Sequence, residues 1–152
     1  MINRILVATD ASEASNRALE MATQFAVLHD ADLLIIHVIR DMQIPFEIDE
    51  IPELEFHQIE TFTDAREEIM RKIAESILRI AREKAEQAGA SKVETAIGTG
   101  DPATSILGFA ERSKMDMIAM GTRGLGKLKG TILGSVSRKV ADNAETSCLI
   151  VR

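Results

Sequence analysis

Short apolar runs recur along the chain, and their length is typical of strands that are buried on both faces. Four runs of this kind lie at residues 5–8, 33–39, 115–120 and 148–151. Residues 93–97 instead alternate apolar with polar side chains, which predicts a strand nearer to the edge of a sheet. The pattern therefore predicts five strands.

Segments with apolar residues three or four positions apart separate these runs, and this spacing predicts helices. Ser12 and Asp101 are good N-cap residues, and Pro102 suits the first position of a helix. Four helices are predicted. The first begins after Ser12, and the second covers residues 62–88. The third runs from Asp101 to about Ser113, and the fourth covers residues 132–144.

Strand and helix alternate throughout, with no internal repeat or linker, so we expect residues 1–152 to form one domain. This order predicts an α/β fold with a five-stranded parallel sheet and helices on both faces. The longest helix carries an apolar stripe that we expect to lie in the core. The stripe consists of Ile69, Ile73, Ile77 and Ile80.

Residues 41–60 interrupt the alternation. Pro45 and Pro52 lie here among seven acidic residues, and the segment contains no Lys or Arg. We expect a long acidic loop that follows the carboxyl end of the second strand. Such a loop is either a solvated excursion or a lid or partner surface.

A glycine-rich segment follows the strand predicted at 115–120. Gly121 and Gly124 are followed, after nine intervening residues, by Gly134 and Ser135 within the last predicted helix. The backbone N–H groups of such a turn, with the positive end of a helix dipole, form a cradle for phosphate. The local charge also favours an anionic ligand, because no acidic residue lies between Asp116 and Asp142. The five basic residues in that interval are Arg123, Lys127, Lys129, Arg138 and Lys139.

The fold itself predicts a ligand at the same place. Five-stranded sheets of this class commonly have the order 3-2-1-4-5, in which strands one and four are neighbours. Ligands bind outside the carboxyl ends of the strands at this reversal. The first strand ends at Thr9 and Asp10, and the fourth ends at Gly121. Asp10 is either a ligand-binding carboxylate there or only a partner of the following helix dipole.

Two common phosphate-binding fingerprints do not fit. Residues 121–128 nearly match the loop of P-loop NTPases, but Leu128 stands where a hydroxyl must reach Mg²⁺. The Rossmann fingerprint fails because Lys129 occupies its last glycine position.

Composition excludes several classes of protein. A net charge of -6 argues against bulk nucleic-acid binding, and no apolar run approaches the ~20 residues of a membrane span. The single cysteine, Cys148, permits no internal disulfide and is expected to be a small buried hydrophobe. We therefore expect a cytoplasmic protein. His29, His37 and His57 are too scattered for a metal site, and His37 is expected to be a hydrogen-bonded core residue.

The longer glycine spacing is more specific. G-x2-G-x9-G-[ST] is met by Gly121, Gly124, Gly134 and Ser135. On this motif the chain resembles the universal stress protein family, and specifically its ATP-binding branch. The likeness covers nearly all 152 residues. Its matching segments are residues 5–12, 37–38, 120–124, 133–137 and 148–151.

This resemblance implies a Rossmann-like domain, adenine nucleotide alpha hydrolase-like, with strand order 3-2-1-4-5 and bound ATP. It implies that Val38 flanks the adenine. The residues that it implies near the ribose and phosphates are Ala8, Thr9, Asp10, Gly121, Arg123 and Gly124. Those that it implies on the phosphate chain are Gly134, Ser135, Val136 and Ser137.

The residue types fit these roles. Because the chain has no Tyr or Trp, adenine needs an aliphatic slot, for which Val38 and Met120 are candidates. Glycines allow close approach of the backbone, and serine hydroxyls donate hydrogen bonds. Asp10 is placed to reach a ribose hydroxyl or the Mg²⁺ of ATP.

Three functions compete. The first is a nucleotide-dependent regulatory module of the stress response, with slow or absent turnover. The second is a slow ATPase or self-phosphorylating enzyme, with Asp10 holding Mg²⁺ and Ser135 or Ser137 near the γ-phosphate. The third is a nucleotide-free scaffold. The intact glycine spacing argues against the third, and the lack of any other carboxylate beside the loop argues against the second.

The last strand predicts a partner. Leu149, Ile150 and Val151 lie in a strand at the edge of the predicted sheet. An exposed apolar edge favours association unless it is covered. Pairing with the same strand of a second subunit covers it, and the resemblance also implies a homodimer.

Overall fold

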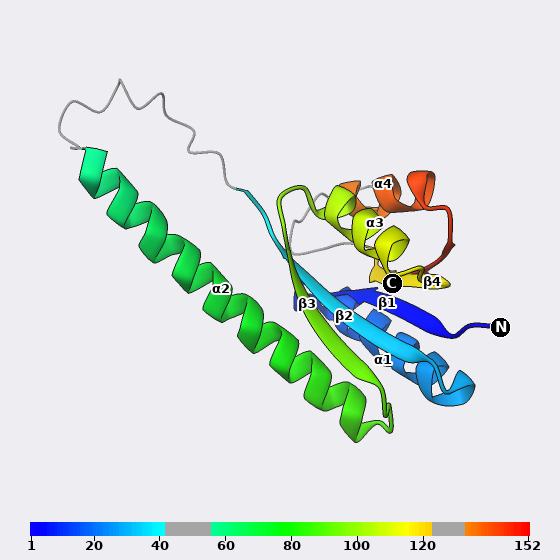
Figure 1. The fold of residues 1–152 in the computed structure, drawn as a ribbon. Coiled ribbons are helices and arrows are strands. Elements are labelled where there is room, and N and C mark those ends of the chain that lie inside the picture. The colour runs from blue at the N-terminus through cyan, green and yellow to red at the C-terminus, as the bar shows by residue number, and fades with distance from the viewer. Residues whose placement is uncertain (42–55, 123–132) are drawn as a thin grey trace.

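The computed structural model describes residues 1–41, 56–122 and 133–152 (Figure 1). Strands and helices alternate along the chain as the sequence predicts. The strands are β1 (Arg4–Ala8), β2 (Asp32–Ile39), β3 (Val93–Thr99), β4 (Met117–Gly121) and β5 (Ser147–Val151). The helices are α1 (Glu13–His29), α2 (Phe56–Gln87), α3 (Pro102–Arg112) and α4 (Ser135–Asn143).

The five strands form one parallel sheet with the order β3-β2-β1-β4-β5, which confirms the predicted topology. β3 lies at an edge, as its alternating pattern predicts. Helices α1 and α2 cover one face of the sheet, and α3 and α4 cover the other. No helix in the described ranges is long and apolar enough to cross a bilayer.

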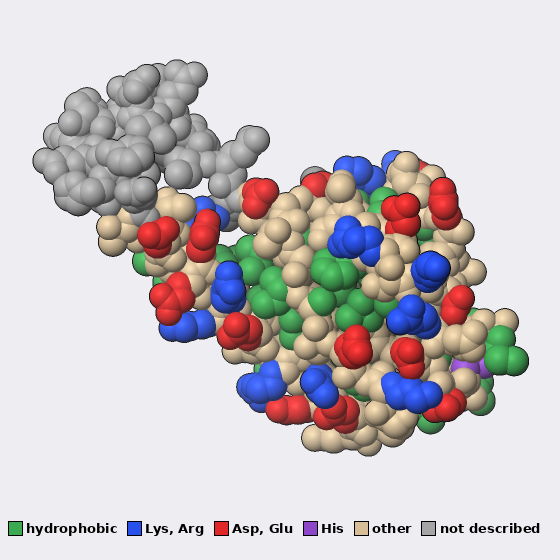
Figure 2. Space-filling model, in the orientation of Figure 1, with side chains coloured by type: hydrophobic (Ala, Val, Ile, Leu, Met, Phe, Trp, Pro, Cys, Tyr) green, Lys and Arg blue, Asp and Glu red, His purple; other side chains and the backbone are tan. Residues whose placement is uncertain are grey.

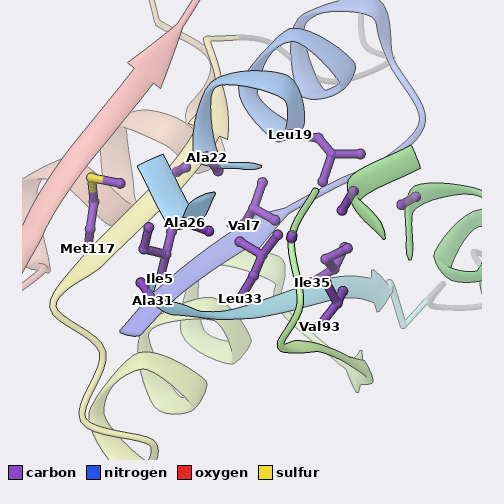
Figure 3. Close-up of a cluster of buried hydrophobic side chains, with 14 of the residues drawn as sticks. Ile5, Val7, Leu19, Ala22, Ala26, Ala31, Leu33, Ile35, Val93 and Met117 are labelled. Carbon is purple, nitrogen blue, oxygen red and sulfur yellow. The ribbon is translucent and has the colours of Figure 1, made fainter. Parts of the chain in front are cut away.

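The central strand β1 is buried from both sides. Ile5 and Val7 pack under α1 and α2 together with Leu33 and Ile35 of β2 (Figure 3). Leu6 points the other way, into the cluster under α3 and α4. Because both faces are covered, a continuous apolar run suits this strand better than an alternating one.

Local capping fixes where two helices begin. The Ser15 backbone N–H donates to the Ser12 hydroxyl at 3.2 Å, so Ser12 is the N-cap of α1. The Asp101 carboxylate accepts from the Thr104 N–H at 2.9 Å and caps α3, with Pro102 in the first turn. Both predicted caps are confirmed.

The predicted boundaries differ elsewhere. α2 begins at Phe56, so residues 56–60 are helical where an acidic loop was predicted. The remainder of that predicted loop, residues 42–55, lies outside the described residues. α4 begins at Ser135 after the N-cap Gly134, so the start predicted at residue 132 is wrong. Gly134 makes no side-chain cap bond, unlike Ser12 and Asp101, so the start of α4 has a weaker signal in the sequence.

The prediction that the isoleucine stripe of α2 lies in the core is wrong. Ile69, Ile73 and Ile80 are 58%, 46% and 46% exposed. A second stripe faces the sheet, and its members are Ala74, Leu78, Ala81 and Ala85. Both stripes have helical spacing, so periodicity alone does not say which one faces the core. The stripe with smaller side chains allows closer packing against the sheet.

Truncation of the two stripes should have unequal effects. We expect Leu78→Ala, at a 5% exposed position, to lower the free energy of unfolding by about 2–5 kcal/mol. The matched change Ile73→Ala removes a half-exposed side chain and should cost about 1 kcal/mol or less. Urea unfolding followed by circular dichroism measures both. Equal losses would show that the isoleucine stripe is buried in solution.

Candidate functional site

The predicted site residues come from elements that meet at the carboxyl edge of the sheet. β1 and β4 are hydrogen-bonded neighbours, and Ala8 is paired with Met120 at their carboxyl ends. β2 flanks β1 on the other side, with Ala8 opposite Ile36 and Val38 two residues further on. The expected reversal of strand order therefore lies at this edge.

The aliphatic residues that the sequence assigns to adenine lie on one face of the sheet. Met120 belongs to the core cluster on the α3 and α4 face, and Ala8, Val38 and Val136 pack against the same cluster. Met120 is buried, whereas the other three are half-buried. Since Val136 is in the first turn of α4, this cluster adjoins the start of that helix.

The turn after β1 is built by side chains that bond to nearby backbone. The Asp10 carboxylate accepts from the Ser12 N–H at 3.0 Å, which shapes the chain immediately before α1. Asp10 is half-buried at the edge of the sheet. Its carboxylate oxygens are chemically suited to Mg²⁺. Within the described ranges, no three His, Cys, Asp or Glu side chains gather into a metal-binding group.

Three hydrogen-bond contacts fix the position of Thr9. Its hydroxyl lies 3.2 Å from the Ser15 hydroxyl and accepts from the Ala11 N–H at 3.2 Å. Its backbone carbonyl is 2.8 Å from Nδ1 of His37. Because a carbonyl only accepts, Nδ1 carries the proton, and the predicted hydrogen bond of His37 is confirmed. His37 is half-buried rather than fully enclosed. Sequence reasoning missed Ser15, whose only signal was a serine in the first turn of a helix.

Thr122 fixes the two ends of the glycine-rich segment. Its carbonyl accepts from the Gly134 N–H at 2.7 Å and from the Ser137 hydroxyl at 2.8 Å. Its own N–H donates to the Val151 carbonyl at 2.7 Å. Sequence reasoning did not include Thr122 among the site residues, because its contribution comes from the backbone. The predicted residues Arg123 and Gly124 lie outside the described residues.

The first turn of α4 supplies donors. The first N–H groups of a helix have no acceptor within it, and they carry the positive end of its dipole. In α4 these groups belong to Ser135, Val136 and Ser137, because the Arg138 N–H already reaches the Gly134 carbonyl. Ser135 is exposed, Val136 half-buried and Ser137 buried. This arrangement can bind an anion such as a phosphate group.

An ion pair connects α4 to α3. Lys139 Nζ lies 3.0 Å from the Asp101 carboxylate, which also accepts from the Thr104 N–H and hydroxyl. The bonds from Thr104, followed by that from Lys139, hold the pKa of Asp101 well below its usual range. Asp101 therefore remains charged and keeps Lys139 turned toward α3. Sequence reasoning missed this pair, since the two residues are far apart in the chain.

Gly121 is required by packing alone. A Cβ at this position would lie 2.8 Å from the backbone carbon of Ala14 and from the Ser15 nitrogen. Such contacts are too short for ordinary side chains, so the end of β4 approaches α1 as closely as glycine permits. The glycine therefore has a structural role whether or not a ligand is present.

Two further features are the charge on the molecular surface and the state of Cys148. Acidic and basic side chains are interspersed over the visible face of the molecule, around a central hydrophobic area (Figure 2). Cys148 packs against the core cluster under α3 and α4, as predicted, although it is only partly buried. Burial raises the pKa of its thiol, which disfavours the reactive thiolate.

Comparison with known proteins agrees with this geometry. A sequence model of the Universal stress protein family matches residues 1–152. The universal stress protein YxiE of Bacillus subtilis is 37% identical over 156 aligned positions, which cover 100% of each chain. The structure of the universal stress protein UspA from Lactobacillus plantarum has a TM-score of 0.84 at 22% identity, covering 99% of this chain and 98% of that one. A universal stress protein in complex with cAMP has a TM-score of 0.70 at 28% identity, covering 99% and 97%.

The packing role of Gly121 can be tested without a ligand. We expect Gly121→Ala to destabilise the nucleotide-free protein by about 1–3 kcal/mol, because the added methyl group meets the α1 backbone. Chemical unfolding of the purified variant measures this. An unchanged stability would show that α1 can move away at little cost.

Proposed function

The chain belongs to the universal stress protein family, and from this premise we propose that it binds ATP in the cytoplasm as a regulatory module of the stress response. Nucleotide binding would change its conformation or its choice of partner, with slow or absent hydrolysis. The proposal rests on the site at the carboxyl edge of the sheet.

One observation carries it: an apolar surface adjoins the first turn of a helix, whose N–H groups have no acceptor within the helix itself. Val38 and Met120 lie with Val136 on the same face of the sheet, and Val136 also belongs to the first turn of α4. Adenine is flat and largely apolar, whereas the phosphates are anionic. A ligand with both parts, such as an adenine nucleotide, matches this pair of surfaces.

The relatives support the class of ligand. A universal stress protein that is 28% identical over nearly the whole chain forms a complex with cAMP. That ligand contains adenine, ribose and a phosphate. We propose ATP for this chain because the glycine spacing ends in Gly134 and Ser135, at a helix start whose several N–H groups can donate to a chain of phosphates.

The proposed roles follow the positions of the residues. Val38 and Met120 would contact the adenine, with Ala8 and Thr9 beside the ribose. Asp10 would contact a ribose hydroxyl or the Mg²⁺ that accompanies ATP. Gly121, Arg123 and Gly124 would lie along the ribose and phosphates. Gly134, Ser135, Val136 and Ser137 would surround the phosphate chain from the first turn of α4.

The small number of carboxylates near the proposed site favours ATP binding without rapid hydrolysis. Hydrolysis needs a group that orients the attacking water. The sequence contains no acidic residue between Asp116 and Asp142, so Asp10 is the one carboxylate assigned to the site. Asp10 already accepts a hydrogen bond from the Ser12 N–H. A regulatory role therefore has more support than an ATPase.

ATP binding can be measured by thermal shift on protein stripped of copurified nucleotide. A ligand at a hundred times its Kd adds roughly 2.7 kcal/mol of stability, which raises Tm by roughly 5–11 °C in a protein of this size. We expect MgATP to give such a shift, and adenosine a smaller one because it lacks the phosphates.

Gly124→Val is the control, because a side chain at this glycine would obstruct the approach of the phosphates to the backbone. Its Tm without ligand should stay near that of the parent protein. If millimolar MgATP leaves the Tm of the parent unchanged, the chain is a nucleotide-free scaffold.

We also propose a homodimer that forms through β5. This strand pairs with β4 on one side, and no described strand lies along its other edge. An edge of this kind favours pairing with a second chain. Size-exclusion chromatography with light scattering should therefore give twice the chain mass of 16.7 kDa at micromolar concentration. A single species of monomer mass would refute the dimer.

A further inference from the structure

Ser137 differs from the other residues at the start of α4 because its hydroxyl is enclosed. The residue is 2% exposed. Its Oγ donates to the Thr122 carbonyl at 2.8 Å and lies 3.1 Å from the Gly134 carbonyl. A serine hydroxyl has one proton to donate, and here both neighbouring acceptors are carbonyl oxygens that share it.

A phosphate group needs donors. Because the proton of Ser137 is used inside the protein, this hydroxyl cannot also donate to a phosphate oxygen without breaking the bond to Thr122. Ser135, by contrast, is exposed at the first position of α4. The two serines of this turn therefore have different surroundings, although the sequence alone gives them the same role.

The bond from Ser137 connects the described residues on the two sides of the glycine-rich segment. Thr122 directly follows the end of β4, and Gly134 is the N-cap of α4. The Thr122 carbonyl joins them by accepting from both Gly134 and Ser137. The Thr122 N–H is itself bonded to Val151 of β5. The first turn of α4 is thus tied to a residue that the sheet holds in place.

We propose that Ser137 is a positioning residue for the nucleotide and not a phosphate ligand. Its buried hydroxyl holds the first turn of α4 against the end of β4, so that the N–H groups of Ser135 and Val136 stay aimed at the phosphates. This inference rests on the proposed nucleotide binding. It assigns the direct hydroxyl contact to Ser135 alone.

The structure also indicates that removal of this hydroxyl is tolerated. In Ser137→Ala the Thr122 carbonyl keeps its bond from the Gly134 N–H, and the Gly134 carbonyl keeps its bond from the Arg138 N–H. No buried acceptor is left unpaired, so the variant should fold with a Tm only a few degrees lower. Ser137→Thr retains a hydroxyl that can bond to a carbonyl one turn earlier, and it serves as the conservative variant.

The test compares ATP with adenosine by calorimetry in the parent protein, Ser137→Ala, Ser137→Thr and Ser135→Ala. We expect Ser137→Ala to weaken ATP binding by roughly tenfold. Its adenosine affinity should change little, because adenosine lacks the phosphates that the N–H groups of Ser135 and Val136 are proposed to bind. Ser137→Thr should restore most of the ATP affinity. A general structural defect would instead weaken both ligands.

Amide hydrogen exchange of the nucleotide-free proteins separates positioning from direct contact. Faster exchange of the Gly134 and Arg138 amides in Ser137→Ala, but not in Ser135→Ala, supports the proposal. Weaker ATP binding with unchanged exchange would make Ser137 a direct ligand and overturn it. Unchanged ATP binding in Ser137→Ala would overturn it as well. If the parent protein binds no nucleotide, the proposed function fails, and this inference fails with it.

Discussion

The parallel pairing of β1 with β4 brings together the two strand ends around which the candidate site is built. The chain completes β3 on one side of β1 and then crosses to the other side, where the Asp116 N–H bonds to the Arg4 carbonyl and starts the pairing. The Asp116 carboxylate strengthens this start, because it accepts from the N–H groups of Asn3 and Arg4, which lower its pKa. From this point the register brings Ala8 beside Met120 at the carboxyl ends. The place of the candidate site is therefore a consequence of topology before it is a property of any side chain.

Several polar groups of the described residues near this edge of the sheet hold the backbone in place. Thr9 is fixed by Ser15 and His37, and Thr122 is fixed by Ser137 and the Gly134 N–H. Internal bonds of this kind keep a loop or helix start in one position, which lowers the entropy lost on binding. Among the described residues, the backbone N–H groups at the start of α4 and an aliphatic surface are suited to contact a ligand. Such a site favours the shape and charge of a nucleotide over any single side-chain contact.

Much of this arrangement was predictable from the sequence, because the signals involved are local. Continuous apolar runs identify strands covered on both faces, and Ser12 and Asp101 cap helices within a few residues of themselves. Apart from the helix boundaries, two failures share one cause, which is dependence on distant packing. The choice between the isoleucine and alanine stripes of α2 is made by the sheet beneath the helix. The bond from Ser137 to Thr122 spans 15 positions and has no local signal, so the family resemblance alone gave Ser137 the same role as Ser135.

The glycine motif therefore combines two kinds of requirement. Gly121 lets β4 approach the backbone of α1, a demand that exists without a ligand. Gly134 meets a different demand, because it is an N-cap that makes no side-chain bond of its own. A cap of this kind leaves the N–H groups of the first turn open, whereas a serine or aspartate cap would accept from one of them. Within one motif, the first glycine secures the packing of the fold, and the later one keeps the helix start available to an anion. The spacing of the motif consequently indicates a phosphate site more through Gly134 than through Gly121.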